Sequence, residues 1–220
     1  MNINFTPSTE SSLSTDLCEI MSRHGSDKGS PSNNCSHNYT KYYYELFNPV
    51  KFANLRVFEL GLGTNNINVP SNMGLHGKPC ASLFGWSQFF PNSAIFGADI
   101  DRGILRQYPE LRIKTFYCDQ TNPSSIHDLW NIPELSEPFD IIIEDGLHEL
   151  NANITFLMNS VHKLLAGGVF IIEDITRDSI SYWIENKKNL EDSLGMPMRV
   201  IDLPYSRNSN DNTLIVFQNN

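Results

Sequence analysis

The chain is poor in cysteine and in basic residues. It has four cysteines among 220 residues, Cys18, Cys35, Cys80 and Cys118. Their irregular spacing argues against a zinc site or a disulfide framework and favours a reduced, cytoplasmic protein. Lys and Arg number 16 against 25 Asp and Glu, which gives a formal net charge of −9 at pH 7. Because nucleic-acid backbones are bound by basic faces, we expect no nucleic-acid partner.

Long hydrophobic runs are also missing. No apolar stretch approaches the roughly 20 residues that a membrane-spanning helix needs, so we expect no membrane partner. Segment 1–14 is polar and rich in Ser and Thr. It lacks the basic start and the apolar centre of a secretory signal.

From residue 55 onward, short apolar runs alternate with helical patterns. The expected strands are 55–60, 94–98, 113–118, 139–143, 169–172, 198–203 and 213–217. The expected helices between them are 82–90, 126–130 and 151–165. Alternating strands and helices predict parallel βαβ units, and the last two runs predict an antiparallel pair. The fold class is therefore α/β: a Rossmann-like, mostly parallel seven-stranded sheet with helices on both faces and a C-terminal antiparallel strand.

The first expected strand runs into a glycine loop at 59–64, ELGLGT. Glycine is needed where the backbone turns sharply and must approach a ligand without a Cβ in the way. A tight strand-to-helix turn without a ligand would use the same residues, so the loop alone leaves both interpretations open. Asn66 stands where a dinucleotide fingerprint has its third glycine, and Asp99 lies beyond that fingerprint's usual spacing of about 20 residues. A dinucleotide cofactor is therefore disfavoured.

Acidic residues follow two later strands. Glu144 and Asp145 end one of them, and Glu173 and Asp174 end the next. If these strands are neighbours, Asp145, Glu173 and Asp174 converge, and three carboxylates cannot stay ionised together without a compensating cation. Oxygen ligands suit a hard divalent ion, above all Mg²⁺. Helix capping by the same carboxylates is the alternative.

A histidine, His148, follows Asp145 by three residues at the start of the next expected helix. With an unperturbed pKa of about 6.5, a histidine can take a proton from a hydroxyl group near neutral pH. We therefore expect His148 and Asp145 to be catalytic, the alternative for His148 being a solvent-facing helix start. We expect His37 at the surface or in a lid, and the tyrosines at 42–44 in aromatic packing.

Three segments, 59–64, 96–101 and 117–120, resemble the successive cofactor motifs of class I S-adenosylmethionine-dependent methyltransferases. The resemblance implies that the glycine loop approaches the methionine and ribose portions, that Asp99 receives the ribose hydroxyls, and that Asp119 lies by the adenine. The residues it assigns to the cofactor are Glu59, Gly61, Gly63, Thr64, Ser82, Asp99, Asp119, Gln120 and Glu144. We further expect two parts of the chain: an N-terminal extension or lid over the active site, 1–50, and an S-adenosylmethionine-binding methyltransferase domain, 51–220.

The Asp-Gly-x-His and Glu-Asp pattern resembles the metal-dependent sugar O-methyltransferases of the mycinamicin type. The resemblance spans about 25–175 and includes GSDKG at 25–29. It implies that Asp145, Glu173 and Asp174 bind Mg²⁺, that His148 is the base, and that the acceptor is a hydroxyl of a sugar, glycan or natural-product precursor. Cys80 stands where the family has a glycine. The macrolide enzymes assemble through an additional N-terminal domain for which this chain is too short, so a homo-oligomer is left open.

Two alternatives to a methyltransferase stay open. One is an NAD(P)-dependent Rossmann oxidoreductase, which the missing third glycine disfavours. The other is a non-catalytic cofactor-binding domain, which His148 and the three carboxylates disfavour.

Overall fold

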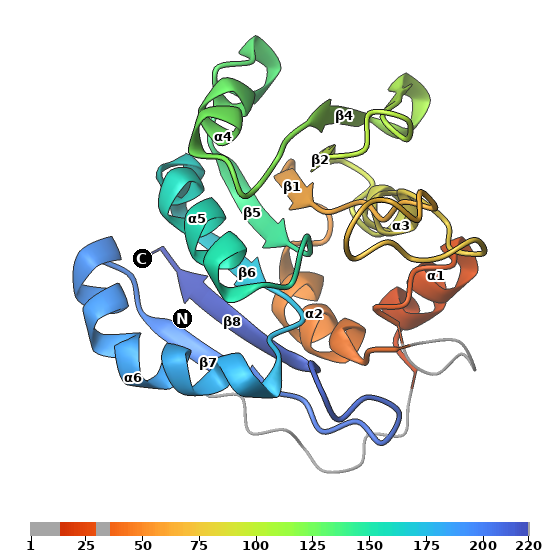
Figure 1. Cartoon of the computed structure of the whole chain (residues 1–220). Helices are drawn as coiled ribbons and strands as arrows, with labels where there is room; N and C mark the ends of the chain where they lie inside the picture. Colours follow the sequence, from red (N-terminus) through yellow and green to blue (C-terminus); the bar gives the residue numbers. More distant parts are fainter. Residues whose placement is uncertain (1–13, 30–35, 220) are drawn as a thin grey trace.

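The computed structural model describes residues 14–29 and 36–219, and these surround one eight-stranded sheet (Figure 1). The strands are β1 (Arg56–Leu60), β2 (Ala94–Asp99), β3 (Gln107–Tyr108), β4 (Ile113–Tyr117), β5 (Phe139–Glu144), β6 (Leu164–Ile172), β7 (Met198–Asp202) and β8 (Thr213–Gln218). Their order in the sheet is β3-β4-β2-β1-β5-β6-β8-β7. The five strands from β4 to β6 are parallel, and β8 runs antiparallel to both β6 and β7.

This arrangement confirms the predicted fold class and its C-terminal antiparallel pair, and it corrects the strand count from seven to eight. The additional strand, β3, is only two residues long and pairs with β4 at the sheet edge. A strand that short has no periodicity to detect in the sequence. The central strands β1, β2 and β5 are almost wholly buried, as expected for parallel strands covered on both faces.

Helices cover both faces of the sheet (Figure 1). They are α1 (Asp16–His24), α2 (Tyr39–Phe47), α3 (Ala81–Phe89), α4 (Pro123–Trp130), α5 (Leu150–Ser160) and α6 (Arg177–Leu194). Side chains of α1, α2 and α3 share one core cluster with one face of the sheet. Side chains of α4, α5 and α6 share a second cluster with the opposite face. None of the described helices combines the length and the hydrophobicity that a membrane span requires.

One helix prediction is wrong at its end, and one helix was not predicted. The pattern at 151–165 predicts a helix up to Leu165, but α5 ends at Ser160 and β6 begins at Leu164, which pairs with Phe139 of β5. Apolar spacing alone cannot distinguish the end of a helix from the start of a buried strand. The helix α6 was not predicted at all, because only Trp183 and Leu190 of its 18 residues are buried.

The described residues before β1 are part of the core. The hydroxyl of Thr15 caps α1 by accepting the N–H of Cys18 at 3.2 Å, and Gly25 ends the helix with a φ of +87°. Large side chains of α2, Tyr39 and Tyr43 among them, are fully buried against the sheet. The division of the chain into 1–50 and 51–220 stays a prediction, and 1–13 lies outside the described residues.

Candidate active site

The carboxyl ends of the parallel strands border a cavity of about 480 Å³. Ligands bind at such strand ends in open α/β sheets, and the volume is typical of small-molecule sites. The predicted site residues that line the cavity are Gly61, Gly63, Thr64, Ser82, Asp99, Asp119, Gln120, Asp145, His148, Glu173 and Asp174. Glu59 and Glu144 are buried and hydrogen-bonded to residues of the lining. The sequence therefore locates one site, while the role of each residue stays a prediction.

The glycine loop packs directly against the end of β5. Gly61 has a φ of +86°, and a Cβ on it would lie 1.9 Å from the carbonyl oxygen of Asp145. Gly63 has a φ of +71°, and a Cβ there would lie 2.3 Å from the methyl carbon of Met73. Glycine is required at Gly61, where a side chain would be strained and would collide with backbone; at Gly63 the backbone conformation favours glycine, and the contacting atom is the movable end of Met73. The contact at Gly61 brings the ends of β1 and β5 together.

Asp99, at the end of β2, is fixed by backbone hydrogen bonds. The N–H of Leu62 donates to its Oδ2 at 2.7 Å, and the N–H of Asp101 donates to its Oδ1 at 2.8 Å. Burial raises the pKa of Asp99, although the backbone hydrogen bonds oppose this shift. Each carboxylate oxygen can accept a further donor, such as the hydroxyl of a ribose.

Asp119 and Gln120 follow β4 and line the cavity beside Asp99. Asp119 accepts the N–H of Thr121 at 3.0 Å and its hydroxyl at 2.7 Å. Gln120 donates to Oε1 of Glu144 at 3.0 Å and accepts the N–H of Leu147 at 2.8 Å. Burial raises the pKa of Glu144 to about 7, despite its hydrogen bond with Gln120. Gln120 thus positions the turn that carries His148.

Glu59, at the end of β1, makes no contact with the cavity itself. Its carboxylate accepts the hydroxyl of Ser82 at 2.7 Å and the indole N–H of Trp86 at 2.5 Å, which ties β1 to the start of α3. The ammonium of Lys28 lies 3.5 Å from the same carboxylate. The contact between Glu59 and Ser82 gives this acid a structural role beside any role toward a cofactor.

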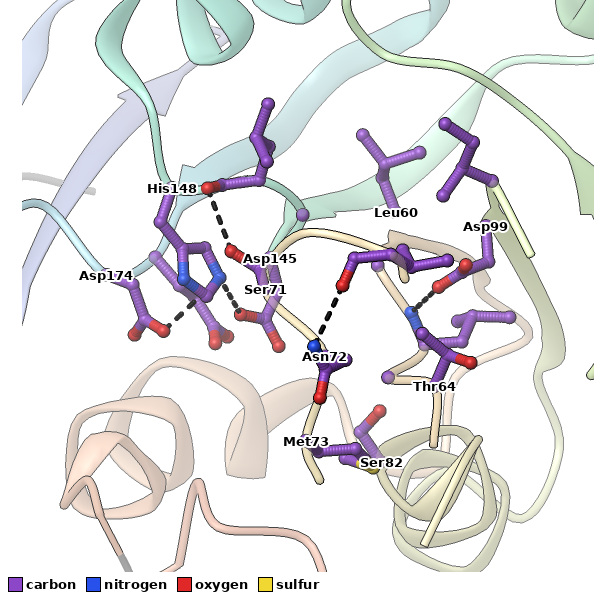
Figure 2. Close-up of a pocket in the computed structure, with 18 of the residues that line it drawn as sticks. Leu60, Thr64, Ser71, Asn72, Met73, Ser82, Asp99, Asp145, His148 and Asp174 are labelled. Carbon is purple, nitrogen blue, oxygen red and sulfur yellow. Dashed lines mark hydrogen bonds and ion pairs between the residues drawn. The ribbon is translucent and has the colours of Figure 1, made fainter. Parts of the chain in front are cut away.

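Asp145, His148 and Asp174 form an acidic group at the ends of β5 and β6. Figure 2 shows the imidazole of His148 between the two carboxylates, with its Nε2 3.2 Å from Asp145 Oδ1 and 3.4 Å from Asp174 Oδ2. One ligand atom of each residue lies within 4.8 Å of the others, so the three could share a metal ion. His148 and Asp174 both have left-handed backbone, with φ of 61° and 54°. Such strain in residues other than glycine concentrates at functional sites.

The two carboxylates determine the charge of His148. Burial by itself would lower the pKa of the imidazole, but the hydrogen bond to Asp145 and the charge of Asp174 outweigh it and raise the pKa to about 10. The ring therefore carries a proton at neutral pH as long as both carboxylates are ionised and hold no metal ion.

Glu173, the third predicted metal ligand, has different partners. Its Oε2 accepts from the ammonium of Lys28 at 2.5 Å, and its Oε1 accepts the hydroxyl of Tyr43 at 2.5 Å. Lys28 also forms a short ion pair with Asp145. The structure thus supplies a cation for the converging carboxylates from the protein itself. Metal binding by Glu173 stays a prediction.

Lys28 and Tyr39 are site residues for which the sequence predicted no role, and Tyr43 was expected only to pack. The one signal for Lys28 was the GSDKG segment at 25–29. The hydroxyl of Tyr39 donates to Asp174 Oδ1 at 2.7 Å, and Tyr39 stacks on His37 with 4.7 Å between ring centroids. His37 is buried and lines the cavity, so of the two expectations for it the surface position is wrong and the lid role stays a prediction, whereas the expected aromatic packing of Tyr43 is confirmed.

The segment 65–80 contributes the remaining wall of the cavity through Val69, Ser71 and Met73. The hydroxyl of Ser71 donates to the carbonyl of Leu147 at 3.0 Å, which connects this segment to the turn that carries His148 (Figure 2). The segment ends at Cys80, whose φ of 64° explains why a glycine would be favourable there.

The sheet order and the strand-end cavity are those of class I S-adenosylmethionine-dependent methyltransferases. The chain superimposes over 94% of its length on the MycE methyltransferase of the mycinamycin biosynthetic pathway, solved with Mg and SAH (S-adenosylhomocysteine). The TM-score is 0.66 at 22% identity, and the match covers 55% of the MycE chain. This likeness shows the fold.

Curated sugar and macrolide O-methyltransferases are similar in sequence, which confirms the resemblance inferred above. The 8-demethyl-8-alpha-L-rhamnosyl tetracenomycin-C 2'-O-methyltransferase of Streptomyces olivaceus is 30% identical over 191 residues, which are 84% of this chain and 45% of that protein. Mycinamicin VI 2''-O-methyltransferase of Micromonospora griseorubida is 32% identical over 170 residues, which are 76% of this chain and 37% of that protein. The chain therefore spans less than half the length of these relatives. No protein-family model matches it.

Proposed function

We propose that this protein is an S-adenosylmethionine-dependent, Mg²⁺-assisted O-methyltransferase that acts on a sugar hydroxyl of a small glycoside. The observation that carries the proposal is the group of Asp145, His148 and Asp174, which faces the same cavity as the glycine loop. A histidine able to accept a proton and two carboxylates able to hold a metal ion suit methyl transfer to a hydroxyl. The relatives named for methylating a rhamnosyl group or mycinamicin VI support the choice of a glycoside.

The cavity suits the proposed cofactor. The chain offers glycine backbone at Gly61 and Gly63, a carboxylate at Asp99 with accepting capacity to spare, and Asp119 further along the same wall. We assign the methionine portion to the glycine loop, the ribose to Asp99 and the adenine to Asp119. The volume of about 480 Å³ leaves room for a small ligand at this wall.

The donor set also suits Mg²⁺, since Asp145 and Asp174 present carboxylate oxygens close to one another and to His148. We propose these two acids as ligands, with Glu173 as the third if Lys28 releases it. A divalent cation there would neutralise the carboxylates that keep His148 protonated and would lower the pKa of a nearby acceptor hydroxyl.

The reaction then needs little covalent chemistry from the protein. A cation held by Asp145 and Asp174 would lower the pKa of His148, so that the imidazolium would release its proton to solvent and the neutral ring could accept the hydroxyl proton. The acceptor oxygen forms a bond to the methyl carbon while the bond from that carbon to sulfur breaks, leaving S-adenosylhomocysteine. The protein contributes mainly by aligning the oxygen, carbon and sulfur.

Calorimetry with S-adenosylhomocysteine and with NADH tests the choice of cofactor. We expect binding of the first and none of the second, and binding of NADH alone would overturn the proposal in favour of an oxidoreductase. Transfer of a labelled methyl group from S-adenosylmethionine to rhamnosides, with Mg²⁺ and with EDTA, tests the reaction. Cofactor binding without transfer to any hydroxyl would favour a non-catalytic domain. A cytoplasmic location and a homo-oligomer stay predictions.

A further inference from the structure

Lys28 is a fully buried lysine among the ends of three adjacent strands. Its ammonium contacts Glu59 of β1 at 3.5 Å, Glu173 of β6 at 2.5 Å, and Asp145 after β5 in a short ion pair. Its exposed fraction is 2%. An ammonium has three hydrogens to donate, and here three carboxylates surround it.

The electrostatic balance of this cluster depends on that charge. Among the described residues, its ammonium is the ion-pair partner shared by Asp145, Glu173 and Glu59. A buried carboxylate without a partner is costly, and Glu59 and Glu173 would lose this partner if an uncharged residue replaced the lysine.

The backbone of Lys28 is anchored independently of these acids. Its carbonyl accepts the N–H of Thr40 at 3.2 Å, and its N–H donates to the hydroxyl of Ser26 at 3.3 Å. The neighbouring Gly29 packs so closely that a Cβ would lie 3.1 Å from the carbonyl oxygen of Cys18 in α1. The lysine is thus presented to the strand ends from the anchored segment 26–29, which follows α1.

The contacts of Lys28 also orient its partners. Asp145 uses Oδ2 for Lys28 and Oδ1 for His148, so the ammonium fixes the carboxylate that contacts the proposed base. Glu173 uses Oε2 for Lys28 and Oε1 for Tyr43. In the proposed enzyme, these contacts set the geometry of the acidic group before a divalent ion arrives.

We propose that Lys28 is a positioning residue of the methyl-transfer site, the built-in cation that keeps the strand-end carboxylates in place when no divalent ion is bound. Only the catalytic effect of this positioning rests on the proposed function. Its electrostatic part concerns the protein alone, so it can be tested without cofactor or acceptor.

The test compares Lys28→Met with wild type by thermal unfolding in EDTA and in saturating Mg²⁺, with no other ligand. We expect the variant to unfold at a lower temperature in EDTA, and Mg²⁺ to restore half or more of that loss, because the ion replaces the missing charge. Mg²⁺ should shift wild type by clearly less. Lys28→Arg should keep most of the stability in EDTA. A Lys28→Met loss that Mg²⁺ does not change would overturn the proposal and leave Lys28 a packing residue.

Lys163→Met is the matched control. Lys163 is also buried and donates to the carbonyl of Ser136 at 2.9 Å, but it lies outside the cavity lining. We expect its loss of stability, whatever its size, to be unaffected by Mg²⁺. If Mg²⁺ stabilised Lys28→Met and Lys163→Met equally, the role of Lys28 would not be specific to the carboxylates that it contacts.

A charge-balanced variant keeps the test decisive if Lys28→Met does not fold. Lys28→Met combined with Glu173→Gln removes one charge of each sign and leaves Asp145 without its lysine. We expect it to fold and to gain more stability from Mg²⁺ than wild type does, and an equal gain would overturn the proposal. Calorimetry with S-adenosylhomocysteine on wild type separates the two proposals. Absence of binding would contradict the proposed function, whereas the role of Lys28 is tested only by the stabilisation that Mg²⁺ gives each variant.

Discussion

The two halves of the cavity are positioned by different kinds of contact. In the glycine-loop half, defined by 61–64, Asp99 and Asp119, the carboxylates accept mainly backbone N–H groups, to which Asp119 adds the hydroxyl of the nearby Thr121. In the acidic half, defined by Asp145, His148, Glu173 and Asp174, the carboxylates accept from side chains.

Those side chains come from far away in the sequence. Lys28 precedes its partners Asp145 and Glu173 by 117 and 145 residues, and Tyr39 precedes Asp174 by 135 residues. A backbone N–H group remains after most substitutions of its residue, whereas a single substitution removes a side-chain donor. We therefore expect single substitutions in the acidic half to change chemistry while the fold survives, and damage in the glycine-loop half to affect folding or cofactor binding.

The largest effect should come from His148→Asn in the acidic half. Asparagine tolerates the left-handed φ of 61° better than most residues but cannot act as the base. We expect methyl transfer to fall about 10²–10⁴-fold. The affinity for S-adenosylhomocysteine, measured by calorimetry, should stay within about twofold, because no contact of the glycine-loop half is touched. His162→Asn, outside the cavity lining, is the control, and unchanged transfer by His148→Asn would remove it as the base.

A smaller effect, on folding rather than chemistry, is expected from Gly61→Ala in the glycine-loop half. The new Cβ would lie 1.9 Å from the carbonyl oxygen of Asp145 and would sit at a φ of +86°. We expect a loss of about 3 kcal/mol in the free energy of unfolding, or roughly 6–12 °C in Tm.

Gly167→Ala is the control for this substitution. It has nearly the same φ, +85°, but nothing within 4 Å of the added Cβ, so only strain of about 1 kcal/mol applies. Equal losses in the two variants, measured by denaturant unfolding, would mean that the contact between β1 and β5 is not what requires glycine.

The same contrast explains what the sequence could predict. The alternation of strands and helices, the glycine loop, and the acids at strand ends are local patterns, so the fold class and the cavity residues were accessible. The two-residue strand β3 and the mostly exposed helix α6 carry too little hydrophobic pattern to be recognised.

The side chains that contact the carboxylates of the acidic half, Lys28 and Tyr39, were not predicted for a different reason. The converging carboxylates need a cation, and the sequence pattern pointed only to a divalent ion, above all Mg²⁺. That Lys28 reaches them depends on how α1 and the residues directly after it, 25–29, lie against the sheet. No local pattern encodes a contact across more than a hundred residues.

The smallest effects are expected from one substitution in each half, Tyr39→Phe in the acidic half and Asp99→Asn in the glycine-loop half. Tyr39→Phe removes the hydroxyl that donates to Asp174 at 2.7 Å while keeping the ring that stacks on His37. Loss of such an outer partner of a metal ligand typically weakens metal binding about tenfold, so we expect that loss for Mg²⁺ with little change for S-adenosylhomocysteine.

Asp99→Asn should show the reverse pattern. Asparagine keeps one of the two acceptors used by Leu62 and Asp101 and loses the charge, so we expect about tenfold weaker binding of S-adenosylhomocysteine. Binding of Mg²⁺ should be unaffected, because Asp99 makes no contact with the acidic half. Both affinities can be measured on each variant by calorimetry. If each substitution weakened both ligands equally, the two halves would act as one coupled network, and the distinction between backbone-held and side-chain-held contacts would have no functional meaning.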